Sequence, residues 1–158
     1  MKDILQVVIS AYTENINELL QEPVALSQVE RFLPNADDKC VEDLKSLIKI
    51  IPPLAKLFVD FINDSNNLIE DRAKVSAALN YLIMPFDVIS DDNGVIGFLD
   101  DAIIMMSVAK KLSVPTRDIQ TIVAEYRPVA SRLEDVMPSW LIDSLSNIEK
   151  VLSQIKSN

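Results

Sequence analysis

Prolines divide this chain into segments whose apolar residues recur at helical spacing, and this pattern limits the fold more than any other feature. The 158 residues include eight prolines and only two glycines. Apolar residues three and four positions apart form one face of an α-helix, and no run alternates as a half-buried strand would. The sequence therefore predicts an all-α protein, a single-domain helical bundle of about eight helices over residues 1–158.

The expected helices begin or end near the prolines. We expect helices at about 2–20, at 23–33 with Pro23 in its first turn, and from about 39 to Pro52 and Pro53, which stop or kink the helix. A fourth is expected at 54–62, a fifth at about 67–84 and a sixth at about 99–112. Pro115 and Thr116 should open a seventh that runs to about Met137, and Pro138 and Ser139 should open the last. Their stripes predict buried side chains, among them Leu5, Val8, Ile9, Tyr12, Ile16, Val41, Leu44, Leu47, Leu68, Ile69, Val75, Leu79, Ile83, Leu141, Leu145, Ile148, Leu152 and Ile155.

The expected sixth helix, "LDDAIIMMSVAKKL", is apolar on nearly every face. Asp100 and Asp101 lie at its start, and Lys110 and Lys111 lie at its end, which matches the helix dipole. Such a helix is typical of the centre of a bundle. We therefore expect a central helical hairpin, about 67–84 and 99–112, joined by a loop rich in aspartate and glycine.

Charge and residue usage exclude several classes of function. The chain has 15 basic and 24 acidic residues, a net charge of -9, which disfavours nucleic acid as a partner. There is no histidine, so Ser–His and Cys–His catalysis are excluded. The single cysteine, Cys40, excludes an internal disulfide and is consistent with a reducing compartment. Basic proteins, basic peptides and free cations remain admissible partners.

Hydropathy favours a cytoplasmic protein. The N-terminal segment has no unbroken apolar run of the kind a signal peptide needs. The most apolar windows are interrupted by lysine or proline and fall short of the roughly 18 residues of a spanning helix. We therefore expect contact with a membrane to be at most peripheral.

The loop "MPFDVISDDNGVIGFLDD", residues 84–101, holds five aspartates and both glycines. Carboxylates around a glycine suggest a Ca²⁺ or Mg²⁺ site, with Asp87, Asp91, Asp100 and Asp101 as the candidate ligands. The spacing argues against an EF-hand, because Gly94 at the sixth position of that loop puts Ile89 at the first ligand position. A different arrangement of the same carboxylates can still hold a cation.

Two other interpretations of this loop stay open. Asp87 facing Asp100 or Asp101 would form a carboxylate pair for acid–base catalysis, with the Tyr81 hydroxyl as a further polar group or as a structural tether. Alternatively the aspartates only hold the turn, with Asp100 or Asp101 complementing the next helix and both glycines in backbone conformations closed to other residues. The residue pattern favours this structural interpretation, with the aspartates directed inward.

The order of residues in the loop resembles the YkvA-like domain of unknown function, which is widespread in bacteria. The resemblance spans about residues 77–112. It is carried by ten residues in order: Tyr81, Pro85, Asp87, Val88, Ile89, Asp91, Gly97, Leu99, Asp100 and Asp101. Ser90 stands where the family usually has proline, and Asn93 and Gly94 replace the usual Ile-Pro. The resemblance implies no activity, since the family is one of unknown function, and many members look membrane-associated.

These observations favour a cytoplasmic protein that is not an enzyme, binds a protein partner and needs no cofactor. It acts alone or peripherally to a membrane complex. The alternative is a divalent-cation-binding protein or metal-dependent enzyme that uses the aspartates of residues 87–101. A third hypothesis is an immunity or antitoxin protein that masks a basic toxin surface.

Overall fold

The computed structural model describes residues 2–83, 89 and 91–154, and within these residues every regular element is helical. The all-α bundle predicted from the sequence is confirmed, and the expected number of about eight helices is close. The elements of the described chain are α1 (Lys2–Leu19), α2 (Leu26–Glu30), α3 (Asp38–Ile48), α4 (Ile51–Asn63), α5 (Ile69–Ile83), the 3-10 segment η1 (Asp91–Phe98), α6 (Leu99–Lys110), α7 (Arg117–Glu134) and α8 (Ser139–Ser153).

Local residue chemistry explains where several helices begin. The side chain of Asp37 accepts a hydrogen bond from the backbone N–H of Cys40 and so caps α3, and Thr116 caps α7 in the same way through Ile119. Pro138 directly precedes α8, as expected.

Two boundaries differ from the sequence prediction. Pro52 and Pro53 do not stop a helix; they lie in the first turn of α4, where a missing backbone N–H costs nothing. The second helix is short and begins at Leu26, so Pro23 lies outside it.

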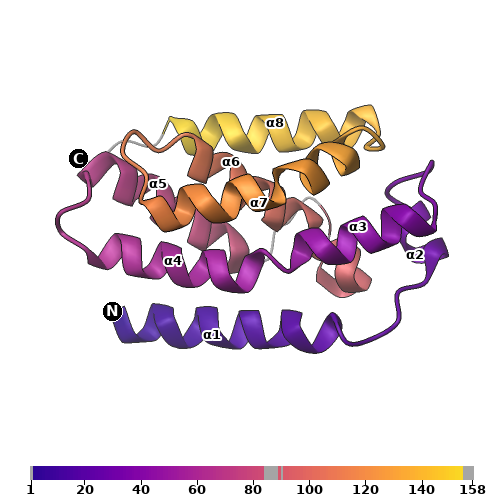
Figure 1. The fold of residues 1–158 in the computed structure, drawn as a ribbon, viewed down its shortest axis with the longest axis horizontal. Helices are drawn as coiled ribbons and strands as arrows, with labels where there is room; N and C mark the ends of the chain where they lie inside the picture. The colour runs from indigo at the N-terminus through magenta and orange to yellow at the C-terminus, as the bar shows by residue number, and fades with distance from the viewer. Residues whose placement is uncertain (1, 84–88, 90, 155–158) are drawn as a thin grey trace.

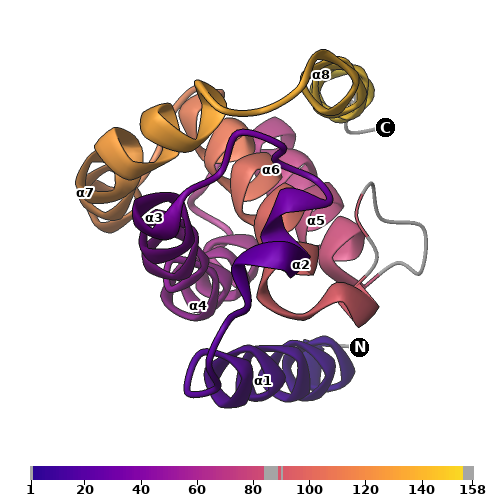
Figure 2. The same ribbon diagram turned by 90° about the vertical axis from the view of Figure 1, so that its right-hand side faces the viewer.

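Helix α6 lies at the centre of the bundle (Figures 1 and 2). It packs against α5, α7 and α8 and also contacts α3 and α4. Ten of its twelve residues are buried, which explains why its sequence is apolar on nearly every face. The expected central hairpin is confirmed as α5 and α6, with η1 in the connection between them.

Helices α1 and α8 lie on opposite sides of the bundle (Figures 1 and 2). Helix α1 packs against α4, α5 and η1, whereas α8 packs against α5 and α6. Helices α3 and α7 pack against each other and are joined by an ion pair. Asp43 on α3 accepts two hydrogen bonds from the Arg132 guanidinium on α7, each 3.0 Å long. These bonds hold the pKa of Asp43 below its usual value.

Most residues of the predicted stripes contribute to one apolar core, but four do not. Val8 is 38% exposed, Leu68 47%, Ile69 62% and Ile83 41%, although helical spacing predicts each of them as buried. Val8 and Ile83 line a groove that is open to solvent, Ile69 is the first residue of α5, and Leu68 precedes that helix. On α8, Leu141 and Leu145 are buried and Ile148 and Leu152 are partly buried, while Ile155 lies outside the described residues.

Cys40 is a free thiol inside the fold, and burial raises the pKa of that thiol.

No helix in the described part of the chain combines the length and the hydropathy needed to cross a bilayer.

Candidate functional site

Asp100 and Asp101 occupy the first turn of α6, and both side chains are completely buried. A carboxylate at this position lies close to the positive end of the helix dipole, which favours it. Burial of two neighbouring carboxyl groups is costly unless polar groups meet them. The structure supplies such groups from two other helices.

The two aspartates accept hydrogen bonds from two different tyrosines. The Tyr81 hydroxyl of α5 donates to Oδ2 of Asp100 over 2.7 Å in the buried interior. The Tyr12 hydroxyl of α1 donates to Oδ2 of Asp101. Tyr81 thus tethers the two helices of the hairpin, and Tyr12 tethers α1 to the start of α6.

Tyr12 also holds α1 through its ring. The ring lies edge-on to Phe98, with centroids 5.6 Å apart and planes at 70°. Phe98 directly precedes α6 and is itself buried. The middle of α1 is therefore attached to the entry of α6 by one aromatic contact and one hydroxyl-to-carboxylate hydrogen bond.

The segment before α6 is a compact 3-10 element with a sharp bend at Gly94. Gly94 has φ 73° and ψ -145°, a conformation that residues with a side chain rarely adopt. A Cβ at this position would lie 3.1 Å from the Gln28 side-chain amide. The special backbone expected for both glycines is found at Gly94, whereas Gly97 has no positive φ.

Ile89, Val95 and Ile96 are buried, so apolar side chains fix this segment in the core. Ile89 is apolar and buried, so it supplies no side-chain oxygen at the first ligand position of an EF-hand loop.

Of the four predicted cation ligands, the structure describes the side chains of Asp100 and Asp101. Pro85, Asp87 and Val88 lie outside the described residues, and for Asp91 only the backbone is described. Asp100 and Asp101 are adjacent in the chain and directed inward. Among the described residues, no three His, Cys, Asp or Glu side chains are grouped closely enough to hold a metal ion. The cation site therefore stays a prediction.

The two cationic side chains of α5, Arg72 and Lys74, each bind a backbone carbonyl of another segment. Arg72 donates from Nε and Nη2 to the carbonyl oxygen of Ile62, over 2.9 Å and 2.7 Å. Lys74 donates from Nζ to the carbonyl oxygen of Lys111 at 3.5 Å. Both side chains thus serve the ends of neighbouring helices.

Asp71 is a further buried carboxylate that the sequence analysis did not single out. Its two oxygens accept the backbone N–H groups of Ser113 and Val114, over 2.9 Å and 2.8 Å, in the connection from α6 to α7. The available signal was its register, because Asp71 precedes the buried Val75 by four residues and lies on the same face of α5.

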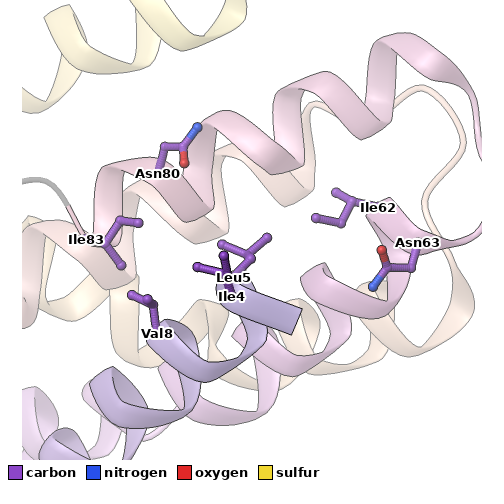
Figure 3. A pocket seen from close by; sticks show the side chains of 7 residues that line it. All are labelled: Ile4, Leu5, Val8, Ile62, Asn63, Asn80 and Ile83. Atoms are coloured by element: carbon purple, nitrogen blue, oxygen red, sulfur yellow. The ribbon is translucent and has the colours of Figure 1, made fainter. Parts of the chain in front are cut away.

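A groove of about 530 Å³ lies between α1, α4 and α5 (Figure 3), and no described aspartate lines it. Val8 and Ile83 lie at one end of it, and Ile62 and Asn63 lie at the other. We call it the α1–α5 groove, and its lining residues are Ile4, Leu5, Val8, Ile62, Asn63, Asn80 and Ile83.

None of these described lining residues is charged, and the two asparagines supply the polar groups. Ile4 is 68% exposed, and Val8 and Ile83 are also open to solvent. Sequence periodicity did not find this groove, since it marks which residues share a face of a helix and not whether another helix covers that face.

Comparison with protein families gives one match. Residues 71–106 match the family described as "Protein of unknown function (DUF1232)", with which the YkvA-like resemblance is consistent. The matched segment runs from Asp71 through Tyr81 to Asp100 and Asp101 and covers most of the α5–α6 hairpin. Neither the comparison with curated proteins nor that with solved structures gives a match.

Proposed function

We propose that this protein is a non-enzymatic cytoplasmic interaction module that binds a helix of a partner protein in the α1–α5 groove. The partner acts either free in the cytoplasm or as part of a membrane complex. The observation that carries the proposal is an open, uncharged groove edged by exposed aliphatic side chains on two helices. Helical proteins commonly recognise partners by receiving the apolar face of an amphipathic helix in such a groove.

The shape of the groove supports a helix more than a small molecule. A volume of about 530 Å³ is within the range of small-molecule sites, but such sites enclose their ligand and orient it with several polar groups. Here Ile4, Val8 and Ile83 face solvent, and the two asparagine amides are the polar groups among the described lining residues. Covering these aliphatic side chains removes apolar surface from water, which favours binding by about 25 cal/mol for each Å².

Residue chemistry also favours binding over catalysis. The described lining residues carry no group that titrates near neutral pH and no nucleophile. Asp100 and Asp101 are buried behind Tyr81 and Tyr12, where they join helices. This arrangement supports a structural role for the pair and a binding role for the groove.

Site-specific photocrosslinking tests the proposal. A photoreactive amino acid replaces Val8 or Ile83 in the full chain, expressed in the organism's own cells. Val151 is the matched control, because it is a 63% exposed aliphatic residue on α8, on the opposite side of the bundle (Figure 2). We expect one discrete protein adduct from both groove positions and none of that size from Val151. No adduct at the groove, or the same adduct from Val151, overturns the proposal.

A further inference from the structure

Helices α7 and α8 lie apart, on two sides of α6 (Figure 2), and a cleft is formed between them. It has two adjoining halves of about 240 Å³ and 250 Å³, which share Ile103, Glu134 and Glu149 as lining residues. We call it the α7–α8 cleft. Each half is smaller than the roughly 300–1,000 Å³ of sites for drug-sized ligands, so the cleft suits a small metabolite.

One half of the cleft is largely apolar. Apart from the shared residues, it is lined by Met137, Ile142, Leu145 and Ser146. Met137 and Leu145 are buried, whereas Ile142 is 42% exposed. This half therefore offers an apolar surface to an aliphatic or thioether side chain.

The other half of the cleft is lined by charges of both signs. Lys110 and Lys111, at the end of α6, line it together with Glu134 of α7 and Glu149 of α8. Within the described part of the chain, neither lysine forms an ion pair with either glutamate. Opposite charges that line one cavity without pairing leave both signs available to a ligand.

The two glutamates belong to different helices and line both halves of the cleft. Two carboxylates beside the same space repel each other unless a cation lies between them. A metal ion is a poor occupant, because no three acidic, histidine or cysteine side chains among the described residues are grouped as metal ligands. An ammonium group fits better, since its N–H groups donate charge-assisted hydrogen bonds to carboxylates.

The parts of the cleft follow in a fixed order, with the apolar side chains in one half, the shared glutamates in the middle and the lysines in the other half. An α-amino acid has the matching groups on one carbon: an ammonium, a side chain and a carboxylate that point in different directions. We propose that the α7–α8 cleft binds an α-amino acid with an aliphatic or thioether side chain. Its ammonium lies between Glu134 and Glu149, and its side chain packs in the apolar half. Its carboxylate meets Lys110 or Lys111.

A zwitterion also suits the charge of the whole chain. The net charge of -9 repels a ligand that carries only negative charge. An amino acid with an apolar side chain has no net charge and is not repelled. The cleft shares no lining residue with the α1–α5 groove, so this proposal goes beyond the binding of a partner protein and does not depend on it.

A nuclear magnetic resonance titration of the full chain tests the proposal. The probes are L-leucine and L-methionine, together with three compounds that each lack one group of leucine. Isocaproate lacks the ammonium, isoamylamine lacks the carboxylate, and glycine lacks the side chain. We expect both amino acids to shift backbone amide signals of α6, α7 and α8, and each of the three compounds to have a Kd at least about tenfold higher than that of leucine.

A double variant of the glutamates assigns the ammonium position. Glu134→Gln/Glu149→Gln should weaken leucine binding at least about tenfold and should not weaken isocaproate, which has no ammonium. The matched control, Glu14→Gln/Glu18→Gln, removes two exposed carboxylates from α1 on the opposite side of the bundle (Figure 2). It should leave leucine binding unchanged.

A double variant of the lysines assigns the carboxylate position in the same way. Lys110→Gln/Lys111→Gln should weaken leucine binding by a similar factor and should not weaken isoamylamine, which has no carboxylate. Lys49→Gln/Lys56→Gln is the matched control, because it removes two exposed lysines that do not line the cleft. Circular dichroism melting confirms that each variant is folded before its affinity is compared.

Three results would overturn the proposal. The first is the absence of shifts with leucine and methionine up to about 10 mM, or shifts confined to other helices. The second is equal affinity for leucine and any of the three compounds. The third is equal weakening of leucine binding by the cleft variants and their controls. None of these results bears on crosslinking at Val8 and Ile83, which tests the binding of a partner protein.

Discussion

The hydroxyl of Tyr81 on α5 lies 2.7 Å from Oδ2 of Asp100 on α6 and donates a hydrogen bond to it. Tyr81 is 7% exposed and Asp100 is fully buried. The bond joins the two helices of the central hairpin within the segment that matches the family of unknown function. This placement makes the tyrosine and the aspartate of the shared signature structural partners.

Replacing Tyr81 by phenylalanine tests that role. Tyr81→Phe keeps the ring and removes the donor to a buried acceptor, so we expect the free energy of unfolding to fall by ~1–3 kcal/mol in a urea titration. Tyr126→Phe on α7 is the matched control, because the Tyr126 hydroxyl makes no hydrogen bond within the described part of the chain. An equal loss in both variants would show that the hydrogen bond from Tyr81 to Asp100 adds no stability of its own.

The contacts of Tyr12 with Asp101 and Phe98 should stabilise the packing of α1 against the start of α6. Tyr12→Phe removes the hydrogen bond to Asp101 and keeps the edge contact with Phe98, whereas Tyr12→Ala removes both. We expect Tyr12→Ala to lose at least ~1 kcal/mol more stability than Tyr12→Phe, because the ring pair and its burial are lost as well. Amide hydrogen exchange should then be faster along α1 than along α8, and equal acceleration of both would contradict local attachment through Tyr12.

Much of the fold could be predicted from the sequence because helical periodicity and proline placement are local signals. The positions of α1, α3, α5 and α8 follow from apolar stripes and capping residues. The start of α4 could not be predicted with the same rules, since two prolines can either stop a helix or occupy its first turn. Which of these occurs depends on packing of the preceding residues Ile50 and Ile51, both fully buried.

The candidate site could be predicted only in part, for a related reason. Asp100 and Asp101 stand out from the order of residues around the loop, but the partner of Asp101 is Tyr12, 89 positions away in the chain. Periodicity placed Tyr12 on a buried face and carried no information on what its hydroxyl meets. The exposure of Val8 and Ile83 could not be predicted either, because it depends on whether another helix packs over the apolar face on which each residue lies.

The contact between Asp43 and Arg132 should make the free energy of unfolding depend on pH. Hydrogen bonding by Arg132 lowers the pKa of Asp43 in the folded chain, so the pair stabilises the fold above the unfolded pKa of about 3.9. This contribution is lost as the pH falls through the folded pKa. We expect Arg132→Gln to reduce stability at pH 7 and to weaken the pH dependence of unfolding between about pH 5 and pH 2.

Arg127→Gln is the matched control for the pH experiment. It removes the same charge from an exposed position of the same helix. A pH dependence weakened equally in Arg127→Gln and Arg132→Gln would trace the effect to net charge and not to the contact with Asp43. Urea titrations at several pH values measure both variants.

The Asp71 carboxylate should stabilise the connection between α6 and α7, because it accepts two backbone hydrogen bonds from that connection. Asp71→Ala leaves the backbone N–H groups of Ser113 and Val114 without their carboxylate acceptor, so we expect a loss of ~1–3 kcal/mol in the free energy of unfolding. The neighbouring exposed residue supplies the control, because Glu70→Ala should change stability by less than ~0.5 kcal/mol. Comparable losses in the two variants would refute the role of Asp71 in that connection.

Thermal unfolding with Ca²⁺, Mg²⁺ and Mn²⁺ tests whether the aspartate loop binds a cation. A cation at a hundredfold its Kd would add about 2.7 kcal/mol of stability, which is several degrees in Tm for a chain of this size. We expect no such rise in the parent protein, because Asp100 and Asp101 are buried and each accepts a tyrosine hydroxyl.

The variants Asp91→Asn and Asp100→Asn give the cation experiment its sharper form. Asp100→Asn should lower Tm with or without a cation, since the buried contact with Tyr81 changes in either case. Asp91→Asn separates the two interpretations of the loop. A cation-dependent rise of Tm in the parent that Asp91→Asn abolishes would establish a site that includes the loop carboxylates, and would replace the structural interpretation of the aspartates with a cation-binding one.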